Sequence, residues 1–301
     1  MQSANYKKGM FWSAMASTMW GISGVIMQFV SQNEQIPATW FLSVRTFFAG
    51  IILLAFAAIR QKGRIFGVFK SMRSVAWLLA YAVFGLMANL YTFYISVQTG
   101  NSSVATILQY LGPFFILLGN LLFKHLKPLR SEVISFGIAL VGVFLVITRG
   151  NIHSLVVPAS AIFWGVLAGV TAACYVVFPR PLVEEGNSPV VILGWGSLIS
   201  SLFFNIMHPM WVNAPHITPT LVISIGAIVI IGTVLAFSLL IYSTTFAPSS
   251  AVSIMDAFQP VVTFILSLIV FHMPFNIVEA IGAVIVLLAV YVLQKTESTL
   301  E

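Results

Sequence analysis

Two stretches of the chain decide the fold, SSVATILQYLGPFF at residues 102–115 and SSAVSIMDAFQPVV at residues 249–262. They begin 147 residues apart, and each opens with paired serines and carries a proline eleven residues later. Where the first stretch has Gln109, the second has Asp256. Both lie inside long apolar runs, so the pattern indicates a membrane protein with an internal duplication and a charged side chain at membrane depth.

The composition also favours a membrane protein. The chain has 301 residues, of which 59% are hydrophobic and 7% charged, and its mean hydropathy is +1.01. A soluble domain has about 25% charged residues, so this chain lacks the polar surface that would cover its core in water. The single cysteine, Cys174, excludes an intrachain disulfide.

Ten segments are apolar and long enough, at about 20 residues each, to cross a bilayer as helices. The expected spans are residues 9–31, 39–60, 74–97, 102–123, 130–148, 159–179, 189–208, 219–244, 249–271 and 275–294. The sequence therefore predicts an all-α integral membrane protein with ten transmembrane helices. These spans use nearly the whole chain and leave no room for a soluble catalytic domain.

The positive charges of the expected loops fall almost entirely on one side of the membrane. Twelve Lys and Arg residues lie on the side of the chain termini, and Arg149 lies alone on the other side. The positive-inside rule then predicts a multi-pass protein of the cell membrane with both termini in the cytoplasm. This placement accounts for the formal charge of +6 without nucleic acid. The basic residues within 60–73 are best explained as a topology signal, and they could also contact anionic membrane lipid.

The duplication extends beyond the two opening stretches. A shift of 147 residues also pairs Pro113 with Pro260, His125 with His272, Glu132 with Glu279 and Gly85 with Gly232; near the start of each half, a shift of 152 pairs Phe11-Trp12 with Phe163-Trp164. Because each half has an odd number of helices, the second half is expected to enter the membrane from the opposite side. Inverted repeats of this kind, here residues 1–148 and 159–295, are typical of secondary transporters.

These motifs resemble the drug/metabolite transporter (DMT) superfamily and its paired EamA domains. The resemblance rests on MWGISG at 19–24, SVRTFFAGIILL at 43–54, the helix at 102–123, EVISFGIALVGVFLVI at 132–147 and EAIGAVIVLLAVYVL at 279–293. It covers almost the whole chain and implies uptake or export of amino acids, amines, nucleotide-related solutes or drugs. The family often has an acidic residue near the ends of the fourth and ninth helices, where this chain has His125-Leu126 and His272-Met273.

Asp256 is the first candidate for a functional residue. It lies seven residues into the ninth expected span, which at 1.5 Å per residue is about 10 Å below the cytoplasmic boundary. Inserting such a charge near the centre of a span costs about 2.5–3.5 kcal/mol, so the carboxyl is expected to face a cavity or a partner. It could bind a cationic solute, carry a proton or hold a structural hydrogen bond. A functional role is favoured because its counterpart Gln109 is also polar.

Arg45, in the second expected span, is the obvious counter-charge. It lies about 9 Å from the outer boundary and about 10 Å from Asp256 in depth, which is longer than a direct ion pair. A shift of the helix boundaries by about two to four residues would remove this difference. Arg45 could instead cap carbonyl groups near an outer gate, or contact a carboxylate of the solute.

Aromatic, amide and proline residues complete the candidate site. A Trp or Tyr near the midplane needs a partner for its polar hydrogen, and the cavity candidates of this kind are Trp20, Tyr110, Trp164 and Trp195. The amides considered with them are Asn89, Gln109 and Gln259. Pro113 and Pro260 are expected to kink their helices and to free carbonyl groups toward a cavity.

The sequence therefore predicts a secondary transporter of a small organic metabolite such as an amino acid or amine. Its mechanism would be alternating access around a cavity between the two repeats, driven by protons, by exchange or by the solute gradient. We expect no cofactor, metal or enzymatic activity, because no nucleotide-binding or HExxH motif is present. A channel-like facilitator and, more remotely, an intramembrane enzyme are the alternatives, and the protein could be a monomer or a homodimer.

Overall fold

The computed structural model describes residues 2–61, 64–151, 153–247, 252 and 255–298, and every regular element in them is helical. The first half contains α1 (Gln2–Gln32), α2 (Ala38–Gln61), η1 (Arg64–Phe69), α3 (Met72–Ala80), η2 (Tyr81–Met87), α4 (Ala88–Thr99), α5 (Ser102–Gln109), α6 (Gly112–Lys124) and α7 (Arg130–Thr148). The second contains α8 (Ala159–Val177), α9 (Arg180–Glu184), α10 (Pro189–Met207), α11 (Pro219–Val229), η3 (Ile230–Leu235), α12 (Ala236–Thr244), η4 (Met255–Ala257), α14 (Phe258–Val270) and α15 (Ile277–Ser298). The prediction of an all-helical protein is confirmed.

Seven helical runs within the described residues are long and apolar enough to cross a membrane. They are Ala38–Arg60, Met72–Thr99, Ser102–Lys124, Arg130–Thr148, Ala159–Glu184, Pro189–Met207 and Pro219–Thr244. Two shorter apolar helices follow, Met255–Val270 and Ile277–Leu293. The long first helix, α1, is more polar than these runs because serine, glycine and glutamine side chains interrupt its apolar residues.

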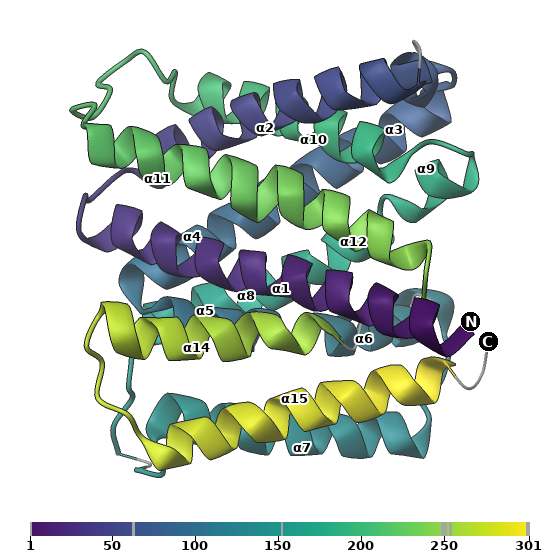
Figure 1. The fold of residues 1–301 in the computed structure, drawn as a ribbon. Coiled ribbons are helices and arrows are strands. Elements are labelled where there is room, and N and C mark those ends of the chain that lie inside the picture. The colour runs from purple at the N-terminus through teal and green to yellow at the C-terminus, as the bar shows by residue number, and fades with distance from the viewer. Residues whose placement is uncertain (1, 62–63, 152, 248–251, 253–254, 299–301) are drawn as a thin grey trace.

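The helices lie side by side in one bundle, with α2 and α10 at one edge and α7 and α15 at the other (Figure 1). The first turns of α1 and the last turns of α15 lie at the same end of the bundle, which we call the termini end; the opposite end is the far end (Figure 1). Besides these two edge pairs, α4 packs on α8 and α1 packs on α12. The backbones of α7 and α15 approach closely at Gly142 and Gly282, where a methyl group added to Gly142 would be 2.7 Å from the carbonyl oxygen of Gly282.

Two helices contain a π-helical segment at corresponding places. These segments are η2 and η3, and each includes a glycine, Gly85 or Gly232, that lies against another helix. A methyl group added to Gly85 would lie 3.2 Å from the Cα atom of Tyr175, and one added to Gly232 would overlap the side chain of Ser23. A larger side chain would therefore force a shift at Gly232 and would be tightly packed at Gly85.

The fourth span is broken where the sequence places its proline. Helix α5 ends at Gln109, and α6 begins at Gly112 with Pro113 in its first turn. In the second half, the 3₁₀ turn η4 precedes α14, whose third residue is Pro260. Because proline has no N–H, each removes the hydrogen bond to the carbonyl four residues earlier. The carbonyl groups concerned are those of Gln109 and Asp256.

Candidate functional site

A central cavity of about 350 Å³ lies between α2, η2, α8, α9, α10 and α12. Its lining is mainly aliphatic, with Leu53, Val190, Leu193 and Ile241 among its residues. Several lining residues, including Val183 and Thr244, come from the parts of their helices nearest the termini end. The cavity therefore occupies the half of the bundle toward that end.

Tyr81 and Tyr175 are two of the four hydroxyl-bearing residues that line the central cavity, with Ser238 and Thr244. Their ring centroids are 5.6 Å apart, and their hydroxyl groups hydrogen-bond to each other. Phe237, another lining residue, has its ring centroid 6.5 Å from that of Tyr175 and 5.1 Å from that of Trp20. Of the four aromatic candidates, Trp20 thus reaches the wall of the cavity through a single intervening ring.

Arg45 points into the bundle from α2. It shares a helix face with Phe41, Ala49 and Leu53, which recur every four residues and are at most 2% exposed. Arg45 itself is 9% exposed, and its Nη1 atom is buried without a hydrogen-bond partner. The hydroxyl of Tyr175 is close enough for an electrostatic interaction with the guanidinium. Among the described residues, no ion pair joins Arg45 to Asp256.

Asp256 lies in a second polar group, between the two halves of the chain. The hydroxyl of Ser17 in α1 donates a 3.2 Å hydrogen bond to its Oδ1 atom. The Tyr110 hydroxyl lies within electrostatic range of this carboxyl, but it is buried and has no hydrogen-bond partner. Among the described residues, the carboxyl thus accepts a hydrogen bond from Ser17, and the unpartnered Tyr110 hydroxyl lies within electrostatic range of it.

Gln109 and Asn89 lie together in a third group. The Gln109 amide donates to Asn89 Oδ1 at 3.2 Å, and the Asn89 amide donates to the Ala168 carbonyl at 3.0 Å. Asn89 also donates to the hydroxyl of Thr171, at 3.4 Å. Thr171 precedes Tyr175 by one turn of α8, so these amides approach the tyrosine pair along that helix.

None of the nine side chains predicted as site residues belongs to the described cavity lining, and three of them make their contacts elsewhere. The Trp195 indole donates to the Ile65 carbonyl at 2.8 Å, which ties α10 to η1. Trp164 packs edge-on against Tyr91, with ring centroids 5.9 Å apart. Gln259 lies against α1 through its backbone, since a methyl group on Gly21 would be 2.9 Å from its carbonyl oxygen.

Hydrogen bonds that sequence reasoning missed join the helices at the far end. Gln28 Oε1 accepts from the backbone N–H of Ser102 at 2.8 Å and from its hydroxyl at 2.6 Å, and this hydroxyl is 3.0 Å from that of Ser267. Gln32 donates to the Gly100 carbonyl at 2.7 Å. The sequence does contain a signal for these hydrogen bonds, because Gln28 and Gln32 lie one turn apart in an apolar helix. We call these four residues, with Gly100, the far-end network.

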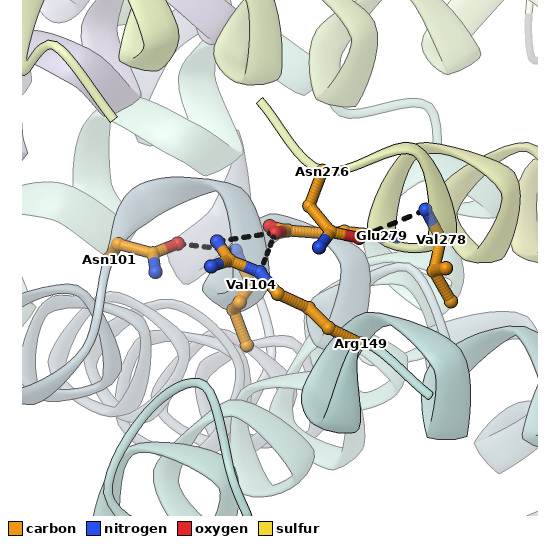
Figure 2. A network of polar contacts seen from close by, with 6 residues as sticks. All are labelled: Asn101, Val104, Arg149, Asn276, Val278 and Glu279. Carbon is orange, nitrogen blue, oxygen red and sulfur yellow. Dashed lines mark hydrogen bonds and ion pairs between the residues drawn. The ribbon is translucent and has the colours of Figure 1, made fainter. Parts of the chain in front are cut away.

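An ion pair also lies at the far end, between α7 and α15. The guanidinium of Arg149 is 2.7 Å from Glu279 Oε2, and the Glu279 side chain is 4% exposed (Figure 2). Asn276 caps the start of α15 by accepting from the N–H groups of Val278 and Glu279 at 2.9 and 3.1 Å (Figure 2). The carboxylate thus lies in the first turn of a helix, where negative charge is stabilised.

The described residues contain no cluster of three His, Cys, Asp or Glu side chains that could hold a metal ion. The apolar helices, the cavity between them and the buried polar side chains define a multi-pass membrane protein.

The chain belongs to the EamA-like transporter family, whose model matches residues 7–148 and again residues 159–294. It is 29% identical over 288 residues to the uncharacterized inner membrane transporter YicL of Salmonella typhimurium strain LT2, covering 94% of each chain. A solved crystal structure of a protein 14% identical in sequence covers all of both chains with a TM-score of 0.64. That likeness concerns the fold alone.

Proposed function

We propose that this membrane transporter is a secondary transporter that moves a small organic metabolite by alternating access. Its ten helices would form two inverted repeats, residues 1–148 and 159–295, around the central cavity. Membership in the EamA-like transporter family supports transport as the activity. The observation that carries the rest is that specific contacts between helices occur twice.

These paired contacts join corresponding residues of the two halves. Gly85 meets Tyr175, and Gly232 meets Ser23, which is the same contact after shifts of 147 and 152 residues. Gly100 meets Ala161 in the same way that Ala247 meets Gly9. Each contact joins a residue of the first half to a residue of the second half. Within a pair of contacts, the position that the first half supplies to one contact is supplied by the second half to the other. A two-fold relation between inverted repeats accounts for both pairs.

The asymmetry of the two ends supports an inward-facing state. The far-end network closes α1, α5 and α14 together, whereas the central cavity reaches toward the termini end. If both termini are cytoplasmic, as the loop charges predict, the cavity faces the cytoplasm. Alternating access would then exchange the conformations of the two halves, breaking the far-end network and closing the cavity at the termini end.

Two measurements test this proposal. Accessibility labelling of cysteines introduced at residues 6 and 295, in a Cys174→Ser background, should place both on the cytoplasmic side; labelling on opposite sides would exclude the inverted repeat. In liposomes, preloaded solute should accelerate the entry of labelled solute by counterflow. A channel-like facilitator is the alternative, and it predicts non-saturating flux without counterflow.

A further inference from the structure

We propose that Arg45 binds the carboxylate of the transported solute, an apolar organic acid whose body lies in the central cavity and whose carboxylate extends past the inner end of that cavity to Arg45. This inference rests on the proposed transport function and adds to it the chemical class of the solute and the residue that selects it.

The first argument is the unsatisfied charge of Arg45. A guanidinium offers five N–H donors, yet the Nη1 atom of Arg45 is buried without a hydrogen-bond partner, and no ion pair among the described residues involves this side chain, which is only 9% exposed. A buried charge without a counter-charge is strongly unfavourable. Asp256, the acid that sequence analysis paired with it, is engaged by Ser17 instead. The negative charge that balances Arg45 is therefore expected to come from a bound molecule.

The second argument is the position of Arg45 relative to the cavity. Leu53, on the same face of α2, lines the cavity and lies eight residues nearer the termini end, or about 12 Å along the helix. Tyr175 connects the two places, since it lines the cavity and its hydroxyl lies within electrostatic range of the Arg45 guanidinium. Arg45 itself is not part of the described cavity lining and lies farther toward the far end than Leu53.

The lining of the cavity defines the rest of the molecule. Its walls are mainly aliphatic and aromatic, which suits an apolar body, and its volume of about 350 Å³ suits a molecule with one ring. A carboxylate matches the fork of one guanidinium through two parallel hydrogen bonds. An amine would be repelled by Arg45. A phosphate dianion would call for a second cation, and neither a lysine nor an arginine belongs to the lining of the cavity as described.

The test compares three probes of nearly equal shape on the purified full-length protein, without a gradient. Phenylacetate carries the carboxylate, phenylacetamide is its neutral analogue and 2-phenylethylamine is its cationic analogue. Phenylacetate should bind at least tenfold more tightly than either of the others. In Arg45→Gln, its affinity should fall to that of phenylacetamide, whose own affinity should not change. Arg60→Gln, an exposed position at the end of the same helix, is the matched control and should behave as the wild type.

Thermal unfolding of the ligand-free protein separates binding from structural support. Removing a buried, unbalanced charge should raise the melting temperature of Arg45→Gln above that of the wild type. A lower melting temperature would show that Arg45 supports the fold, and would overturn the proposal. Tyr175→Phe provides an independent variant that keeps the ring. It should weaken phenylacetate binding several-fold and leave phenylacetamide binding unchanged.

Two further results would contradict the proposal. One is equal affinity for all three probes, or unchanged phenylacetate binding by Arg45→Gln. The other is competition by chloride or inorganic phosphate at the same concentrations as phenylacetate, which would indicate an inorganic anion in place of an organic acid. These assays measure binding and need no transport. A negative result would therefore contradict the role of Arg45 without contradicting the carrier mechanism, which the counterflow and labelling experiments test separately.

Discussion

Ser17 in the first helix donates a hydrogen bond of 3.2 Å to the carboxyl of Asp256, 239 residues later in the chain. The bond joins the first half of the chain to the second. It ties the carboxyl to a helix that must move relative to α14 if the two halves exchange conformations. Asp256 is therefore placed where a change of its charge would be felt by both halves.

We expect Asp256→Asn to impair transport far more than folding. The amide keeps the size of the side chain and can still accept from Ser17, but it can neither titrate nor carry charge. In proteoliposomes, an imposed pH gradient should change the rate of solute uptake by a proton-coupled wild type. It should not change the rate for the variant. Normal transport combined with a large fall in melting temperature would assign Asp256 to the structure instead.

Gln28→Leu should destabilise the closed far end. The substitution leaves the N–H of Ser102 without its acceptor and leaves the Ser102 hydroxyl with only the Ser267 hydroxyl in reach, and a buried unsatisfied group costs about 1–3 kcal/mol. Water-soluble thiol reagents should then label a cysteine at position 102 faster than in the parent protein. Asn33→Leu is the control, since this exposed side chain, one residue past the end of α1, makes no hydrogen bond to the described far-end network. Equal labelling in the two variants would argue against a gate here.

Gly142→Leu should destabilise the pairing of α7 and α15. A methyl group there would already lie 2.7 Å from the Gly282 carbonyl oxygen and 2.9 Å from the Val286 nitrogen. Overpacking of this kind costs about 1–3 kcal/mol, measured as a lower melting temperature. The same change at Gly137, in the same helix but with nothing within 4 Å of an added methyl group, should have little effect. Equal losses would mean that helix propensity, not packing, decides the result.

Arg149→Gln should be destabilising because it leaves the buried Glu279 carboxylate without its counter-charge. Breaking a buried pair costs about 3–5 kcal/mol, and the partial exposure of Arg149 should reduce the loss to about 1–3 kcal/mol. The double variant with Glu279→Gln should recover part of it, since the unpaired charge is then gone. Strict additivity of the two single losses would exclude a direct interaction.

Much of the fold was predictable because membrane helices carry a strong local signal. The expected span at residues 130–148 coincides with α7, and the one at 219–244 coincides with the run from α11 to α12. Proline chemistry indicated the interruption near Pro113. The π-helical segments were not predicted, since they depend on how Gly85 and Gly232 pack against other helices, and the sequence does not display such contacts.

The candidate site was predicted less completely. Depth identified Asp256 and Arg45 as buried charges, but it could not show which helix each side chain faces. Both tyrosines of the cavity were missed as site residues, because position along a helix does not distinguish a cavity wall from packed core. Trp195 was chosen by the same reasoning, yet its indole binds the backbone of η1. These differences arise from the rotation of each helix, which tertiary packing sets.

The two π-helical segments bear on the history of the chain. A π turn holds one residue more than an α turn, so each segment amounts to a single-residue insertion in its helix. η2 and η3 occupy corresponding places in the halves. On the proposed duplication, the insertion arose once, in an ancestor of half the present length, and was copied when its gene doubled.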